Sequence, residues 1–130
     1  MRARLGIGAL LVGVYHTQKD LFQTIAKIGS GLSAGEWVRV RERLDEIRVL
    51  NRSPRVDSQI TPDVWVEPTY VITVIADEIT CSPRHTCGRD EGGAGLALRF
   101  PRALGFIRDD KSPEDATTVE EIQEMYAMQL

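Results

Sequence analysis

Residues 8–28 read GALLVGVYHTQKDLFQTIAKI, and this stretch decides the fold. Residues 8–15 are rich in aliphatic side chains and predict a buried strand. The polar residues 16–20 predict a turn, and residues 21–28 predict a second strand. Two such runs joined by a short polar segment indicate an antiparallel hairpin.

A helix is expected directly after the hairpin. Gly29 and Gly31 break the second strand, and Ser33 followed by Glu36 forms a capping box. The box predicts a helix over about residues 34–50. Its apolar face is formed by Trp37, Val40, Leu44, Ile47 and Leu50. The arginines elsewhere on the helix are predicted to be solvated, with a phosphate track as the alternative. They are Arg39, Arg41, Arg43 and Arg48.

The remainder of the chain predicts further short strands and a final helix. Residues 51–62 contain two prolines and few large apolar side chains, so we expect a connecting loop there, and a second loop at residues 80–95. The expected strands are residues 63–67, 70–79 and 95–100, with 104–107 continuing the last, and the final helix spans about residues 117–128. Trp65 is assigned to the core.

This order of elements predicts a mainly β fold. Five or so short antiparallel strands with an inserted helix and a C-terminal helix are typical of a small Greek-key barrel, the OB-fold, and an SH3-like barrel fits almost as well. The 130 residues suit one domain, and no run approaches the ~20 apolar residues of a membrane span. We therefore expect a single domain over residues 1–130, with a lead-in at about 1–7 and a tail with the C-terminal helix at 112–130.

The charge of the chain is unevenly distributed. The net charge of −3 by itself argues against a nucleic-acid-binding protein. However, residues 1–56 carry ten basic and five acidic side chains, whereas residues 57–130 carry six basic and fourteen acidic ones. This asymmetry indicates an anionic partner for one face and a basic partner for the acidic tail. An ordinary solvated surface is the alternative on charge alone.

The cysteines do not predict a metal site. Cys81 and Cys87 have His85 between them, but a structural zinc site needs about four ligands and the chain has no CxxC pair. Two ordinary thiols are the leading interpretation, and a close disulfide is the alternative. Nucleophile, P-loop and HExxH motifs are absent.

Two neighbouring groups of charged residues are the best candidates for chemistry. Residues 99–102 read RFPR, and residues 108–111 read RDDK. Arginine binds phosphate in a bidentate manner and lysine adds a mobile point charge. Such a set can grip a polyphosphate while Asp110 orients a base or a metal-bound phosphate. Charged turns of this kind are also common on protein surfaces, so the spacing alone leaves both readings open.

Several motifs together resemble one known family. The RFPR and RDDK groups, followed by SPEDATT at residues 112–118, resemble motif VI of ATP-dependent DNA ligases. Residues 27–33 (KIGSGLS), residues 62–68 (PDVWVEP) and the Ser82-Pro83 pair with His85 resemble further segments of the same domain, in the same order. The resemblance covers about residues 8–126 and is to the C-terminal OB domain of archaeal-type ligases.

The resemblance implies an incomplete enzyme. In this family a separate nucleotidyltransferase domain carries the lysine that becomes adenylated, within a KxDG motif that is absent here. The chain is therefore expected to be inactive alone. The family's domain begins with a strand upstream of the region that residues 2–8 resemble, so the barrel is expected to lack its first strand.

The resemblance also implies roles for individual residues. Arg108, Asp110 and Lys111 would be catalytic, with Arg108 and Lys111 on the β- and γ-phosphates of ATP, and no residue would bind a metal. Phe100 would lie against the minor groove near a nick, although without the resemblance a strand phenylalanine is expected in the core. The full expected DNA-binding set is Lys27, Gly29, Gly31, Arg99, Phe100 and Arg102.

The implied function is that of an OB module in an ATP-dependent DNA ligase. It would bind nicked duplex DNA and supply motif VI for enzyme adenylation and for sealing 5′-phosphate/3′-hydroxyl nicks in replication, repair and recombination. ATP and Mg²⁺ would serve the full-length enzyme, with none bound by this chain alone. Its partners would be nicked duplex DNA and the nucleotidyltransferase domain of the same enzyme, and no membrane would be involved. For an archaeal or bacterial source, the location would be the cytoplasm, at the nucleoid. The alternatives are a stand-alone nucleic-acid-binding OB protein without catalytic activity and the OB domain of an mRNA-capping enzyme, which RFPR and SPEDATT disfavour.

Overall fold

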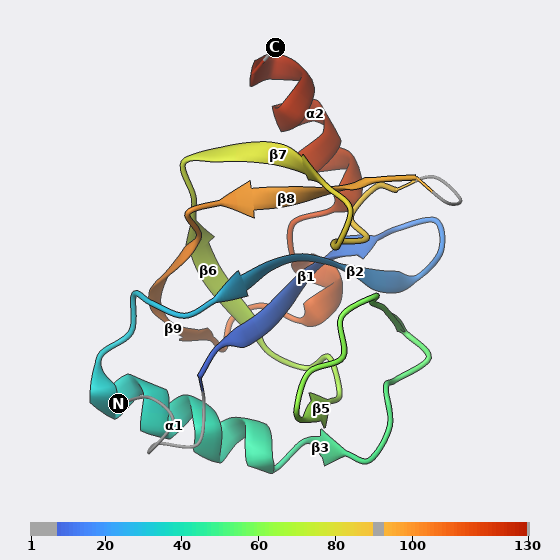
Figure 1. Cartoon of the computed structure of the whole chain (residues 1–130). Coiled ribbons are helices and arrows are strands. Elements are labelled where there is room, and N and C mark those ends of the chain that lie inside the picture. The colour runs from blue at the N-terminus through green and yellow to red at the C-terminus, as the bar shows by residue number, and fades with distance from the viewer. Residues whose placement is uncertain (1–7, 90–92, 130) are drawn as a thin grey trace.

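The computed structural model describes residues 8–89 and 93–129, so the expected lead-in at residues 1–7 lies outside the described residues. Strands dominate, and two helices accompany them (Figure 1). The elements are β1 (Leu10–His16), β2 (Leu21–Ile28), α1 (Ala34–Asp45), β3 (Arg48–Val49), β4 (Val56–Asp57), β5 (Trp65–Val66), β6 (Val71–Ile75), β7 (Glu78–Ser82), β8 (Gly95–Arg99), β9 (Arg102–Arg108), a 3₁₀ turn (Pro113–Asp115) and α2 (Val119–Gln129). The mainly β class with an inserted and a C-terminal helix is confirmed.

The predicted hairpin of β1 and β2 is confirmed. The two strands pair antiparallel from Leu10 opposite Ile28 to His16 opposite Leu21, with a bulge at Val12 and Gly13. A Cβ atom on Gly13 would lie 2.6 Å from the carbonyl oxygen of Gln23. The bulge therefore requires glycine at this position because the two backbones approach so closely.

Helix α1 begins as predicted but ends early. The Ser33 amide donates to Glu36 Oε1 at 2.9 Å, and the Glu36 amide donates to Ser33 Oγ at 3.2 Å, which completes the capping box. The predicted end at Leu50 is wrong, because Arg48–Val49 pairs with Trp65–Val66 as the β3–β5 ladder. Leu50 is 97% exposed, so the apolar face ends before it.

The aromatic core assignment also changes. Trp37 on α1 is buried, whereas Trp65, which the sequence placed in the core, is only partly buried. Trp65 belongs to the two-residue strand β5 at the bottom of the view in Figure 1, beside the end of α1. A short strand of this kind offers it too little packing surface to exclude solvent.

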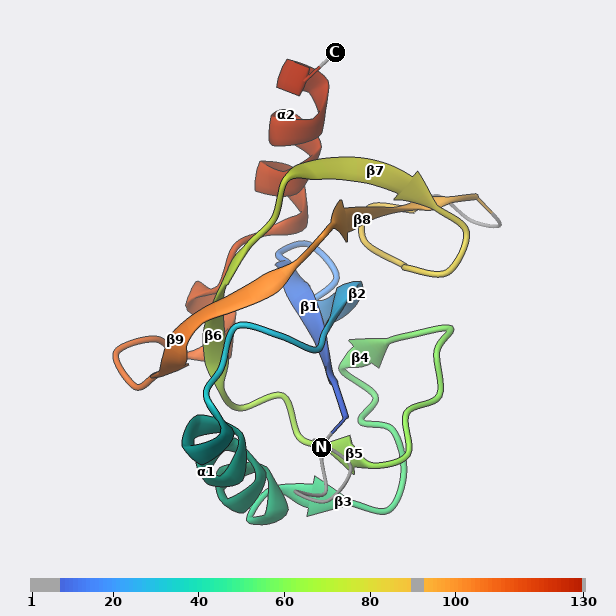
Figure 2. The ribbon, with the colours of Figure 1, turned by 60° about the vertical axis from the view of Figure 1, so that its left-hand side comes forward.

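A long bent ribbon forms the other half of the fold (Figure 2). The predicted single strand over residues 70–79 is wrong, because the chain turns at Ala76–Asp77 and forms β6 and β7 instead. β6 pairs antiparallel with β9, and β7 pairs antiparallel with β8. The opposing strand bends between Arg99 and Arg102, where the Asp77 amide donates to the Arg99 carbonyl at 2.9 Å.

The barrel is not closed within residues 8–89 and 93–129. The strands form four separate hydrogen-bonded groups, and β2 pairs with β4 in parallel, against the antiparallel expectation and in a segment predicted to be a loop. Apart from its pairing with β2, β1 forms an isolated parallel bridge between Tyr15 and Thr118. That the barrel lacks a first strand stays a prediction.

Helix α2 covers one end of the strands. Val119 and Ile122 are buried in the core, and the Gln129 side chain forms hydrogen bonds with the backbone of Ile79 in β7 at 2.7 and 2.8 Å.

Burial raises the pKa of the Cys87 thiol to about 12. Cys87 and the exposed Cys81 are free, so the disulfide alternative is wrong. Neither helix of the described segments has the length and apolar character needed to cross a membrane.

Candidate functional site

Strand β9 carries the two candidate groups at its opposite ends. Phe100 and Arg102 lie where the strand begins, and Arg108 lies where it ends, followed by the turn to Lys111. Six residue steps along a strand span ~20 Å. One phosphate group therefore cannot contact both ends, and the two groups are separate candidate sites.

In the turn after β9, Arg108 and Asp110 form a bidentate ion pair. Arg108 Nε lies 2.8 Å from Asp110 Oδ1, and Nη2 lies 2.7 Å from Oδ2. The guanidinium lowers the pKa of Asp110 to about 2, and the carboxylate raises the pKa of Arg108. The depressed pKa means that Asp110 loses its charge only as the pH falls through about 2, so the pair is intact at neutral pH.

Lys111 completes this turn and is exposed. Within the described part of the chain it makes no hydrogen bond or ion pair, although its charge adds to the effect of Arg108 in lowering the pKa of Asp110. The structure thus brings the three predicted catalytic residues together, with one guanidinium held in place and one ammonium group available to an anion.

The sequence missed a contact that α1 makes with this turn. Arg43, predicted to be a solvated residue, places Nη2 2.7 Å from Asp109 Oδ1 and stacks over the Tyr70 ring with its Cζ 4.6 Å from the centroid. Arg39 stacks in the same way over Phe106 at 5.1 Å. Arg39 and Arg43 are four positions apart and therefore lie on one face of the helix, and this spacing was the one feature of the sequence that could have indicated these contacts.

The remaining arginines of this region point elsewhere. Arg41 and Arg48 both lie near Asp45, at 3.7 and 3.9 Å. They are exposed, as predicted for a solvated face. The phosphate track along the helix stays a prediction.

Phe100 is exposed, so the prediction from its strand position alone, that it lies in the core, is wrong. Its side chain is 62% exposed and its φ is +53°. A positive φ is uncommon outside glycine and marks a tight change of direction. The bend between β8 and β9 therefore presents the ring to solvent.

Two arginines support Phe100 and are themselves neutralised. Arg102 Nη1 donates to the Phe100 carbonyl at 2.8 Å and to Asp77 Oδ1 at 3.1 Å. Arg99 stacks over the Phe100 ring at 5.1 Å and pairs with Glu78 at 3.0 Å. Of the predicted DNA-binding arginines, Arg99 thus contacts the ring and Arg102 the backbone of Phe100, and each is paired with a carboxylate.

The glycine turn after β2 packs against the beginning of β9. The Ala103 amide donates to the Ser30 carbonyl at 2.9 Å. Gly31 has a φ of +100°, and a Cβ atom there would lie 2.1 Å from the Ala103 carbonyl oxygen. The turn that holds Gly29 and Gly31 therefore lies next to Arg102, and backbone packing explains the need for glycine at position 31.

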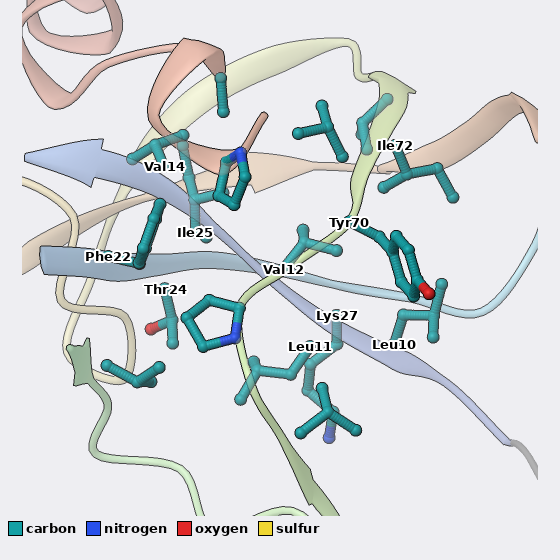
Figure 3. A pocket seen from close by; sticks show the side chains of 18 of the residues that line it. Leu10, Leu11, Val12, Val14, Phe22, Thr24, Ile25, Lys27, Tyr70 and Ile72 are labelled. Carbon is teal, nitrogen blue, oxygen red and sulfur yellow. The ribbon is translucent and has the colours of Figure 1, made fainter. Parts of the chain in front are cut away.

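A broad, open pocket of about 1320 Å³ includes the space between β1, β2 and β6 (Figure 3) and extends to residues of α1, β5, β7 and α2. Apolar side chains such as Leu10, Val12 and Ile72 line most of it. Lys27, Arg108 and Lys111 also line it, whereas Phe100 and its two arginines do not. Lys27 is exposed near the end of β2, two residues before the glycine turn that packs against the beginning of β9, and its place in the DNA-binding set stays a prediction. Residues 8–89 and 93–129 contain no group of three or more His, Cys, Asp or Glu side chains placed to hold a metal ion.

Comparison with known proteins gives consistent matches. Residues 3–111 match the family described as the ATP dependent DNA ligase C terminal region. A probable DNA ligase of Dictyoglomus thermophilum is 64% identical over 128 residues, which is 98% of this chain and 22% of that protein. A DNA ligase of Sulfurisphaera tokodaii is 50% identical over 126 residues, covering 95% of this chain and 21% of that protein. This chain thus spans about a fifth of the length of these relatives.

The fold also has a solved counterpart. A structure of mycobacterial DNA ligase D complexed with ATP and MES superimposes with a TM-score of 0.60 and 24% identity, covering 87% of this chain and 33% of the other. This likeness shows the fold and agrees with the OB-type class predicted from the sequence.

Proposed function

The chain belongs to the family of ATP-dependent DNA ligase C-terminal regions, and from this premise we propose that it is the module that closes first on ATP and then on nicked duplex DNA. The observation that carries the proposal is the exposed turn after β9, where Arg108, Asp110 and Lys111 lie together. The chain contributes to catalysis as part of a longer ligase, in replication, repair and recombination, and is inactive alone.

The first role of the module is to stabilise the leaving group during adenylation. The lysine nitrogen of the catalytic domain bonds to the α-phosphorus while the bond to the bridging oxygen breaks, and pyrophosphate departs with that electron pair. Arg108 and Lys111 contact the β- and γ-phosphates and neutralise the charge that develops there. Asp110 keeps the Arg108 guanidinium in place through its bidentate pair.

The full-length enzyme is expected to use Mg²⁺ with ATP. Residues 8–89 and 93–129 hold no cluster of metal ligands, and Mg²⁺ would be held by the phosphates and the catalytic domain. The residues of this chain act on the triphosphate through their charges.

The second role is to bind the nick with the opposite end of β9. The exposed Phe100 ring lies against the minor groove, and Arg99, Arg102 and the Gly29–Gly31 turn lie near flanking phosphates. The ~20 Å between the two ends of the strand supports this division, because the domain must turn to present each end. Arg99 and Arg102 exchange Glu78 and Asp77 for phosphate when DNA binds.

A chimera tests the proposal. In the D. thermophilum protein, the matching 128 residues are replaced by this chain, and adenylation and nick sealing are compared with the same protein truncated before that region. We expect the truncated protein to be at least about 100-fold slower in adenylation and the chimera to recover most of that loss. A folded chimera that does not recover adenylation, with a chain that still binds nicked DNA, would support the stand-alone binding protein instead.

Substitution of Phe100 tests the DNA-binding end separately. We expect Phe100→Ala in the chimera to weaken binding to a nicked duplex by about tenfold, because the apolar contact with the groove is lost. Leu104→Ala is the matched control, since Leu104 is a similarly exposed apolar residue of β9, at 59%. Fluorescence anisotropy at fixed salt measures both, and equal affinities for the two variants would contradict the assignment of Phe100.

A further inference from the structure

The two carboxylates of the turn after β9 bind different partners. Asp110 folds back on Arg108, whereas Asp109 pairs with Arg43 in the last turn of α1, with 2.7 Å between Nη2 and Oδ1. The turn is therefore held from inside by one ion pair and from α1 by the other. Removal of the second pair takes away the described contact between α1 and this turn.

Arg43 also contacts the strand opposite. Its guanidinium lies over the ring of Tyr70, which directly precedes β6, and Val71 of β6 is the ladder partner of Arg108. Arg43 thus contacts Asp109, which follows β9, and Tyr70, which precedes β6, at the end of the β6–β9 ladder where Arg108 lies. The Asp109 carboxylate raises the pKa of Arg43, so this contact keeps its charge throughout the pH range of enzyme assays.

We propose that Arg43 is a positioning residue for the phosphate-binding turn, which sets the location of Arg108 and Lys111 by holding Asp109 against Tyr70. The inference rests on the proposed function, because the turn has to bind phosphate for its position to matter. Arg43 itself contacts no phosphate and acts through Arg108. Its planar guanidinium suits this task, since it pairs with a carboxylate and stacks on an aromatic ring at the same time.

The chain contains a matched control one helical turn earlier. Arg39 stacks over Phe106 of β9 at 5.1 Å, on the same face of α1. It therefore makes the same kind of helix-to-strand contact as Arg43, and its described partners, the Phe106 ring and the nearby charge of Glu36, lie outside the turn. Loss of general docking between α1 and β9 would affect both arginines alike.

The test is a double-mutant cycle in the chimera, with single-turnover adenylation as the readout. We expect Arg43→Ala to slow adenylation by about 10- to 100-fold, as small displacements of positioned groups do, and Arg39→Ala by about twofold at most. In an Arg108→Ala background, Arg43→Ala should cause no further loss, because residues that act as a unit are not additive. Asp109→Asn should reproduce the loss of Arg43→Ala, which keeps the test valid where Arg43→Ala folds poorly.

The outcomes separate this inference from the proposed function. Equal losses for Arg43→Ala and Arg39→Ala, or losses of Arg43→Ala and Arg108→Ala that multiply, would overturn the positioning role and leave the phosphate role of Arg108 standing. Unchanged adenylation in Arg108→Ala would overturn the proposed function, and the inference with it.

Discussion

Replacement of Arg108 by alanine is expected to slow adenylation by about 10²–10³-fold, the usual cost of removing a group that stabilises charge in a transition state. The guanidinium is held by the bidentate pair with Asp110 at 2.7 and 2.8 Å, so its position is set before ATP arrives. A preorganised charge of this kind needs no rearrangement during the reaction. Single-turnover formation of the adenylated enzyme in the chimera, followed with α-labelled ATP, measures the effect.

Two further variants make this prediction specific. Lys111→Ala should slow the reaction by only about tenfold, because a flexible ammonium group is a less ordered partner for phosphate than an arginine fork. Arg48→Ala removes an exposed arginine that pairs weakly with Asp45 at 3.9 Å, and it should leave adenylation unchanged. If Arg108→Ala and Arg48→Ala are equally active, the phosphate role of this turn is refuted.

Replacement of Gly31 by alanine is expected to destabilise the domain by about 3 kcal/mol, from a left-handed backbone that costs ~1–2 kcal/mol and overpacking that costs ~1–3 kcal/mol. The φ of +100° and the 2.1 Å approach of a Cβ atom to the Ala103 carbonyl oxygen are the two causes. The midpoint of thermal unfolding should fall by roughly 10 °C. Circular dichroism on the chain measures it.

Gly35→Ala is the matched control for this prediction. Gly35 lies in the first turn of α1, and a Cβ atom there has no neighbour within 4 Å. Alanine should therefore stabilise the domain by about 0.5 kcal/mol, through the lower entropy of the unfolded chain. A Gly31→Ala variant with unchanged stability but lost DNA binding would mean that the glycine serves the phosphate contact and not the packing against β9.

Local features were predictable because their causes lie within a few residues. The strand prediction for residues 21–28 and the Ser33–Glu36 capping box placed the second strand and the beginning of α1 correctly. The same logic failed at the end of α1, where Arg48–Val49 pairs with Trp65–Val66 across a loop. Helix propensity is weak, so a distant pairing partner overrides it.

In the candidate site, too, the residue types were predictable from the sequence, whereas their exposure and long-range contacts were not. The residue types at positions 108–111 made this turn a candidate for phosphate binding, because arginine and lysine are the side chains that suit phosphate. Nothing local indicated that Phe100 is exposed, since a strand pattern places alternate residues inside and only the backbone at φ +53° turns the ring outward. Arg43 was missed because its partner Asp109 lies 66 positions away.

The sequence by itself predicted the β1–β2 hairpin, the beginning of α1, the C-terminal helix, the family and the types of residue that can meet a phosphate. Only the tertiary structure decided which residues lie together: Arg43 pairs with Asp109 next to Arg108, while Gly31 lies beside the beginning of β9. The physical reason is the distance along the sequence between the residues that interact. Turns, caps and strand patterns come from interactions between near neighbours, whereas contacts such as Arg43 with Asp109 form only after burial of apolar surface has closed the long loops between them.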